Sequence, residues 1–107
     1  MEQLTQFASL SEFEGTDYGV GACVILVDMV PGDRIRLHRH TYPEIFIVQE
    51  GTATYRVGSS TEEVIAPRTL IVAAGVPHGF TNTGSTRLKQ VDIHLSPRFI
   101  TEWLEDQ

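Results

Sequence analysis

Apolar side chains recur in short stretches along the chain, and turn-forming residues separate one stretch from the next. Within several stretches apolar and polar positions alternate, which is the period of a β-strand that buries one face. Gly, Pro, Asn, Asp and Ser stand at the breaks, where they favour tight turns. The pattern predicts an all-β fold of about eight strands, a sandwich or a double-sheet jelly-roll barrel. The predicted strands are 20–30, 34–40, 44–49, 52–57, 63–66, 69–74, 78–81 and 87–95.

The last part of the chain has a different spacing. Apolar residues stand at positions 99, 100, 103 and 104, as on one face of a helix. Ser96 suits a helix N-cap and Pro97 suits the first helical position. We therefore expect a short closing helix that packs Phe99, Trp103 and Leu104 on the sheet.

A chain of 107 residues is expected to form a single domain. We divide 1–107 into an acidic N-terminal arm (1–17), the barrel (18–95), and the C-terminal helix and tail (96–107). The arm could cross to a partner chain or cover its own barrel with its apolar residues Leu4, Phe7, Leu10 and Phe13.

Composition supports this reading and excludes some functions. Val, Ile and Thr number 29 against 16 for Ala, Leu and Met, a balance that favours strands over helices. The net charge of −6 argues against a protein that tracks nucleic acid or binds an anionic membrane. One cysteine, Cys23, permits no internal disulfide, and no stretch resembles a signal peptide or a membrane span. We expect a cytoplasmic protein without nucleic-acid or membrane partners.

Histidines mark one predicted strand as a place for chemistry. Because side chains on a strand alternate between faces, His38 and His40 share a face with Arg36. Glu44 follows after a bend that contains proline, and His78 could arrive from a neighbouring strand. Three neutral imidazole nitrogens and one carboxylate suit a divalent Fe, Mn, Ni, Zn, Co or Cu ion and leave coordination positions open.

The spacing of these residues resembles the first motif of the cupin family, as Gly32-x5-His38-x-His40-x3-Glu44-x6-Gly51. The second cupin motif is matched in part by Gly75-x2-His78-x3-Asn82, with Pro67 and Ala73 where that motif has Gly and Pro. The resemblance spans residues 32–82. It implies a double-sheet β-barrel that holds one divalent transition-metal ion inside through His38, His40, Glu44 and His78. It also implies a homodimer formed through the sheets.

Two further residues, His94 and Arg36, are candidates for catalysis. Gln90, Asp92 and His94 lie opposite Val91 and Ile93 by alternation. If this polar face looks into the barrel, His94 could orient a metal ligand or act as a general base; if it looks outward, His94 is a surface histidine. Arg36 could bind a carboxylate or phenolate of a substrate, or it could pair with an acid at the barrel rim.

These features together predict a metal-dependent enzyme that acts on a small organic molecule at the open metal positions. Dioxygenase-like chemistry is favoured, with isomerase, cyclase or lyase chemistry as the other reactions that suit such a site. The alternative is a non-catalytic cupin that binds or senses a small molecule. The acidic residues concentrate at the chain ends, since residues 18–101 carry a formal charge of +1, so we expect a pocket for neutral chelating or anionic ligands.

Overall fold

The computed structural model describes residues 11–105, and strands make up nearly all of its regular structure. A single 3-10 helix, η1 (Gly15–Tyr18), stands among them. The strands are β1 (Glu12–Phe13), β2 (Cys23–Met29), β3 (Arg34–Arg39), β4 (Glu44–Glu50), β5 (Thr52–Val57), β6 (Ser60–Ile65), β7 (Arg68–Val72), β8 (His78–Thr81), β9 (Leu88–His94) and β10 (Glu102–Trp103).

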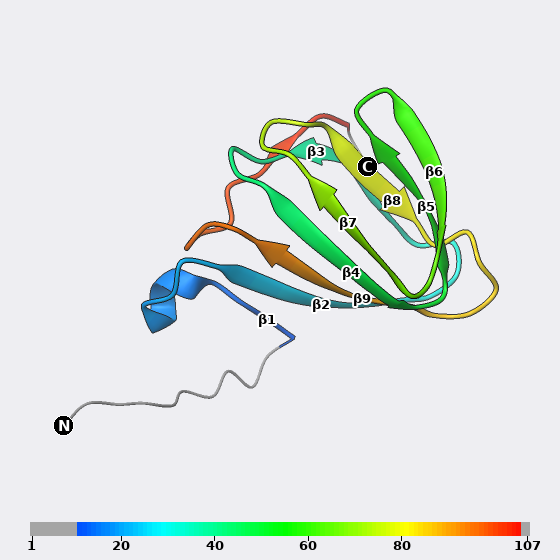
Figure 1. Ribbon diagram of the computed structural model, residues 1–107, viewed down its shortest axis with the longest axis horizontal. Coiled ribbons are helices and arrows are strands. Elements are labelled where there is room, and N and C mark those ends of the chain that lie inside the picture. The colour runs from blue at the N-terminus through cyan, green and yellow to red at the C-terminus, as the bar shows by residue number, and fades with distance from the viewer. Residues whose placement is uncertain (1–10, 106–107) are drawn as a thin grey trace.

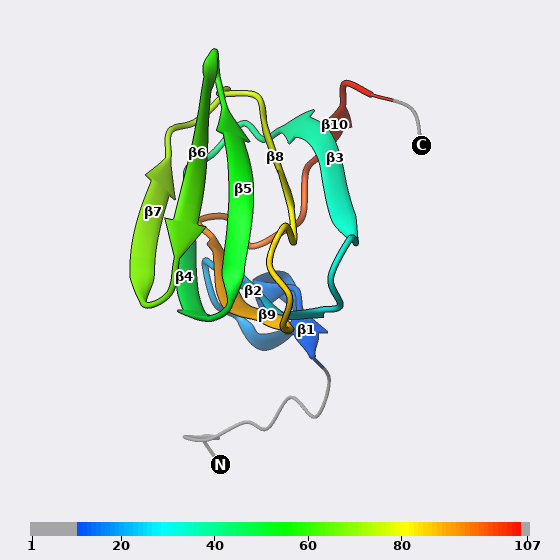
Figure 2. The same ribbon diagram turned by 90° about the vertical axis from the view of Figure 1, so that its right-hand side faces the viewer.

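The strands form two five-stranded antiparallel sheets (Figure 1). The first sheet has the order β1-β2-β9-β4-β7 and the second has the order β10-β3-β8-β5-β6. Seen after a quarter turn, β3, β8, β5 and β6 stand beside one another as one layer (Figure 2). The all-β prediction is confirmed, and the arrangement is consistent with a jelly roll. The two sheets are not closed into one continuous barrel, however, and the described residues form ten strands where about eight were expected.

The two additional strands lie at the sheet edges and have only two residues each, too few to produce an alternating pattern. In β1, Glu12 pairs with Ile25 and Phe13 with Val24 of the chain's own β2. Phe13 of the acidic arm therefore belongs to this chain's own sheet. The other apolar arm residues, Leu4, Phe7 and Leu10, lie outside the described residues.

The prediction of a C-terminal helix is wrong. In place of a helix, β10 pairs with the edge of β3, with Trp103 opposite His38. The Leu104 amide donates to the Leu37 carbonyl at 2.9 Å, and the Leu37 amide donates to Glu105 Oε1 at 3.0 Å. A helix of about nine residues is marginal by itself, whereas the unpaired backbone groups of β3 require partners. Tertiary pairing therefore overrides the helical spacing.

Aromatic and aliphatic side chains fill the space between the sheets. Phe46 from the first sheet lies 5.7 Å from both Tyr55 and Phe80 of the second sheet, measured between ring centroids. Together with Val48 and Leu88 these side chains are almost fully buried. This packing fixes the distance between the sheets at the place where the polar cluster described below begins.

A β-bulge in β3 determines which of its side chains face inward. Ile35 pairs with Phe80 and His38 with His78, so β3 has one more residue than β8 between these pairs. In a regular strand Ile35 and His38 would face opposite sides, whereas here both line the interior. Gly79 permits the bulge, because a Cβ at this position would lie 2.8 Å from the Ile35 carbonyl oxygen.

Candidate metal centre

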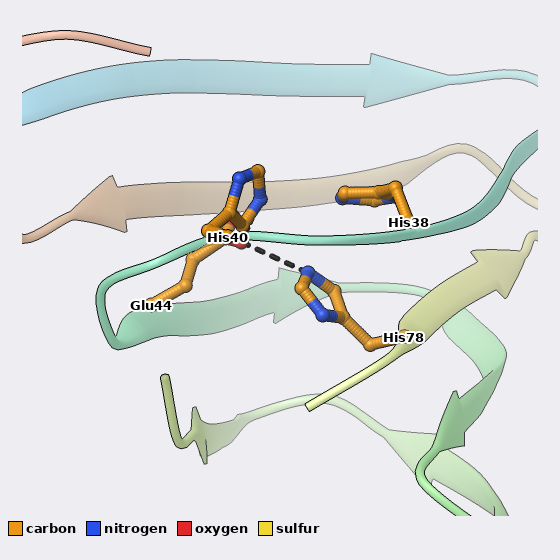
Figure 3. Close-up of side chains that lie close together, drawn as sticks. All are labelled: His38, His40, Glu44 and His78. Atoms are coloured by element: carbon orange, nitrogen blue, oxygen red, sulfur yellow. Dashed lines mark hydrogen bonds and ion pairs between the residues drawn. The ribbon is translucent and has the colours of Figure 1, made fainter. Parts of the chain in front are cut away.

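Four buried side chains meet between the sheets at one end of the core (Figure 3). His38 comes from β3, His40 directly follows that strand, Glu44 begins β4, and His78 begins β8. One ligand atom from each lies within 4.8 Å of those of the other three. The four residues predicted from the sequence spacing are therefore brought together by three strands and one loop.

Backbone carbonyl groups set the orientation of all three imidazole rings. The Nδ1 atom of His38 lies 2.8 Å from the Arg36 carbonyl, that of His40 lies 2.9 Å from the Ile100 carbonyl, and that of His78 lies 2.9 Å from the Val76 carbonyl. Because a carbonyl only accepts, each Nδ1 carries the hydrogen. In the neutral rings each Nε2 then holds a free lone pair, which is the form that a metal ligand needs.

Glu44 is the common contact of the cluster. Its Oε1 lies 3.0 Å from His40 Nε2 and 3.1 Å from His78 Nε2, and its Oε2 lies 3.0 Å from His94 Nε2. Burial would raise the pKa of Glu44, but the three imidazole groups around it outweigh burial and hold the pKa well below its usual range. Glu44 is thus an anion, as a metal-binding carboxylate must be.

The nitrogen and oxygen atoms of the cluster would be satisfied better by a bound cation than by hydrogen bonds among themselves. Burial, with a smaller effect from the neighbouring imidazoles, lowers the pKa of His38 to about 4, so this ring is neutral near pH 7. His40 Nε2 is fully buried and, although it lies close to Glu44, lacks the geometry of a hydrogen bond. A buried nitrogen without a hydrogen bond, beside a neutral imidazole and a carboxylate, is the arrangement that a divalent metal ion completes.

His94 faces the interior and contacts Glu44. Of the two positions considered for this residue, it has the inward one and is not a surface histidine. Its Nδ1 lies 2.7 Å from the Tyr42 hydroxyl, which in turn accepts a hydrogen bond from the Ile100 amide at 3.2 Å. If the hydroxyl donates to Nδ1, Nε2 carries the hydrogen that Glu44 accepts. Tyr42 was not recognised from the sequence, where it stands in the turn between His40 and Glu44.

A cavity of about 210 Å³ adjoins the cluster. His38, His40 and Glu44 contribute to its wall, and most of the remaining wall is apolar. Phe46 and Phe80 form part of this apolar wall. Three further residues of the wall were not identified as site residues from the sequence. Phe99 and Trp103 come from the segment expected to be a helix, and Asp92 has no spacing typical of a metal ligand.

Arg36 does not line this cavity. Its guanidinium carbon lies 4.1 Å from the centroid of the Trp103 ring, and Trp103 stands between it and the interior beside His38. Arg36 instead borders a separate surface pocket together with Gly32, Asp33 and Arg34. Its Nε atom is buried without a hydrogen-bond partner. The common face expected for Arg36 and the two histidines is interrupted by the bulge.

Comparison with known proteins places these features in a family. The family model for the cupin domain matches residues 25–94. The chain is 36% identical over 73 residues to the polyketide synthase CurC of Streptomyces cyaneus and spans 47% of that protein's length.

Solved structures share the fold at low sequence identity. A conserved Klebsiella pneumoniae protein with a double-stranded β-helix domain is 23% identical, with a TM-score of 0.73 over 80% of this chain and 76% of that one. Oxalate oxidase in complex with the substrate analogue glycolate is 21% identical, with a TM-score of 0.77 over 88% of this chain and 53% of that one. Among residues 11–105, no helix is both long and apolar enough to cross a bilayer.

Proposed function

The chain belongs to the cupin domain family, and on this premise we propose that it binds one divalent transition-metal ion through His38, His40, Glu44 and His78. The observation that carries the proposal is the orientation of the three rings: a backbone carbonyl holds Nδ1 of each ring, and one ligand atom from each ring lies within 4.8 Å of a Glu44 carboxylate oxygen. Iron, manganese, nickel, zinc, cobalt and copper all suit this donor set.

We propose further that the bound ion acts with the cavity on a small organic molecule. The ion would supply an open, positively charged coordination site for a chelating or anionic substrate. The protein's own residues provide the rest of the environment: Glu44 lowers the charge of the site, and His94 keeps that carboxylate in place. Phe46, Phe80 and Trp103 limit the water in the cavity.

A metalloenzyme with dioxygenase-like chemistry is our preferred reading, with isomerase, cyclase or lyase chemistry as further reactions of the same site. Its support is the structural similarity to an oxalate oxidase, an oxidoreductase that holds a small hydroxy acid in the solved complex. For Arg36, which lies against the Trp103 ring, we propose that it binds an anionic group on the outer side of that ring and not one beside the metal ligands.

A non-catalytic role as a small-molecule sensor is the second candidate, and one observation favours it. Both nitrogens of His94 are occupied, one by Tyr42 and the other by Glu44, so this histidine has no free nitrogen for proton transfer. A site that holds a ligand without turning it over would look the same in this respect. We therefore assign His94 a positioning role in either case.

The outer face of the first sheet supports a homodimer. Two rows of mainly apolar residues cross this face, Val24, Ile93, Ile45 and Ile71 in one and Leu26, Val91, Ile47 and Thr69 in the other. Leu26 is 54% exposed and Ile71 is 73% exposed. We propose that a second copy of the chain covers this face. A cytoplasmic location is part of the same proposal and agrees with the buried free thiol of Cys23.

Metal analysis of untagged protein tests the first step. We expect close to one equivalent of a transition metal in the wild type and a loss of most of it in His78→Ala. Less than about a tenth of an equivalent in the wild type, unchanged by His78→Ala, would refute the metal site. Oxygen uptake and product analysis with metal-loaded protein then separate the enzyme from the sensor, because stabilisation by a ligand that is never consumed favours the sensor.

A further inference from the structure

Asp92 is a buried acidic residue beside the metal centre, outside both the ligand set and the network around Glu44. It lies on the inward face of β9 and is 5% exposed. Its side chain lines the same cavity as His38 and Glu44. A molecule that fills this cavity therefore meets the Asp92 carboxyl group.

One oxygen of this carboxyl group is held by the core. Gln90 Nε2 donates to Asp92 Oδ1 at 2.7 Å, and the Tyr55 hydroxyl donates to Gln90 Oε1. Tyr55 and Gln90 are each 1% exposed, so close packing holds this chain of hydrogen bonds in place. Because an amide nitrogen only donates, Oδ1 is an acceptor. The second oxygen, Oδ2, is the one left for a ligand.

The two carboxyl groups of the cavity differ in their surroundings. Glu44 is surrounded by histidines that stabilise its charge. Asp92 has no cationic partner among the described residues that contact it, and one amide donor satisfies one of its oxygens. Burial, reinforced by the nearby Glu44 carboxylate, raises the pKa of Asp92 well above its usual range. A neutral Asp92 whose Oδ1 accepts from Gln90 carries its proton on Oδ2, the oxygen left for a ligand in the cavity.

We propose that Asp92 recognises the ligand, donating a hydrogen bond from its Oδ2 hydroxyl to an acceptor oxygen on the part of the ligand that faces away from the metal. The inference rests on the proposed metal function and narrows its substrate class. Small chelating molecules that carry a second carbonyl or carboxylate group are favoured, and those that carry an ammonium group in the same place are disfavoured.

Three probes with one chelating group and different ends test this inference. Acetohydroxamate ends in a methyl group, malonomonohydroxamate in a carboxylate, and glycine hydroxamate in an ammonium group. Binding of each to zinc-loaded protein is measured by isothermal titration calorimetry for the wild type, Asp92→Asn and Asp92→Leu. The asparagine can accept from Gln90 with Oδ1 and donate into the cavity with Nδ2, so it reproduces a neutral Asp92, whereas leucine removes the donor.

We expect the wild type and Asp92→Asn to bind malonomonohydroxamate with similar affinity, and Asp92→Leu to bind it about tenfold more weakly. Affinity for acetohydroxamate should stay the same in all three proteins. A wild-type preference for glycine hydroxamate that disappears in Asp92→Asn would overturn the inference, because it would mean an ionised Asp92. Equal affinities of the wild type and Asp92→Leu for every probe would overturn it as well.

Two controls separate this inference from the proposed function. Metal content and melting temperature are measured for each variant, and Asp92→Ala replaces the leucine variant if that one does not fold. A wild type that takes up no metal would refute the proposed function and this inference with it. Normal metal uptake with no discrimination among the probes would refute the inference alone.

Discussion

The hydrogen bond between His94 and Glu44 offers a direct test of how the metal site is held. His94 Nε2 lies 3.0 Å from Glu44 Oε2, and the two side chains are only 5% and 3% exposed. A buried hydrogen bond to a charged group contributes about 1.5–3 kcal/mol. His94→Leu removes this donor while leaving all four predicted ligands in place. We expect its metal dissociation constant to rise about ten- to a hundredfold, the range typical of residues that orient metal ligands.

Zinc affinity, measured by competition with a fluorescent chelator, is the assay for this prediction. His94→Gln keeps an amide donor near Glu44 and should lose less affinity than His94→Leu. Tyr42→Phe removes the hydroxyl that lies 2.7 Å from His94 Nδ1 and should have a smaller effect again, because it acts on Glu44 only through His94. If folded His94→Leu binds zinc as tightly as the wild type, His94 does not hold the carboxylate in a binding position and the reasoning fails.

Three further predictions concern pH, the bulge and the dimer. Burial lowers the pKa of His40, but the nearby Glu44 carboxylate and the hydrogen bond to the Ile100 carbonyl outweigh burial and raise it; protons therefore compete with metal at this ring, and zinc affinity should fall between about pH 8 and about pH 6 in chelator competition. Gly79→Ala should destabilise the fold by about 1–3 kcal/mol in urea denaturation, whereas Gly21→Ala, where an added Cβ meets nothing within 4 Å, should change little. Leu26→Glu should convert a dimer to a monomer in light scattering after gel filtration, while Ile65→Glu, at an even more exposed apolar position on the other sheet, should not; a monomeric wild type would contradict the proposed interface.

Three of the four clustered residues were predictable to lie together because their spacing in the sequence is local. His38 and His40 stand two residues apart on one strand, and Glu44 follows within one bend, so their spacing alone brings three donors together. His78 was predictable only through the resemblance to the cupin motif, since its position depends on the pairing of β3 with β8. Local sequence patterns thus predicted the main strands and the close approach of His38, His40 and Glu44.

The features that the sequence did not predict, the C-terminal strand and the inward position of Asp92, depend on contacts between distant parts of the chain. The segment after Ser96 has helical spacing, yet two side-chain bonds between Arg39 and Glu102, of 3.1 and 2.9 Å, join it to β3 across more than sixty residues of sequence. Hydrophobic periodicity carries no information about such a partner. From the sequence, Asp92 was likewise only one residue of a polar face. The sequence does not show that this face looks into the cavity, because that depends on the opposite sheet.

The bulge in β3 links the wrong prediction for the C-terminal segment to the expected common face of Arg36 and the two histidines. It turns His38 and Ile35 to the same side, and it leaves the Leu37 amide and carbonyl on an edge where residues 104 and 105 can bind them. That binding places Trp103 opposite His38, where its ring forms part of the cavity wall and separates Arg36 from the metal ligands. The irregularity that positions His38, a proposed metal ligand, thus also determines how the cavity is enclosed. Since a bulge of one residue reverses the facing of everything beyond it, alternation read from the sequence placed His38 and His40 on one face, as they are in the structure, but also placed Arg36 beside them.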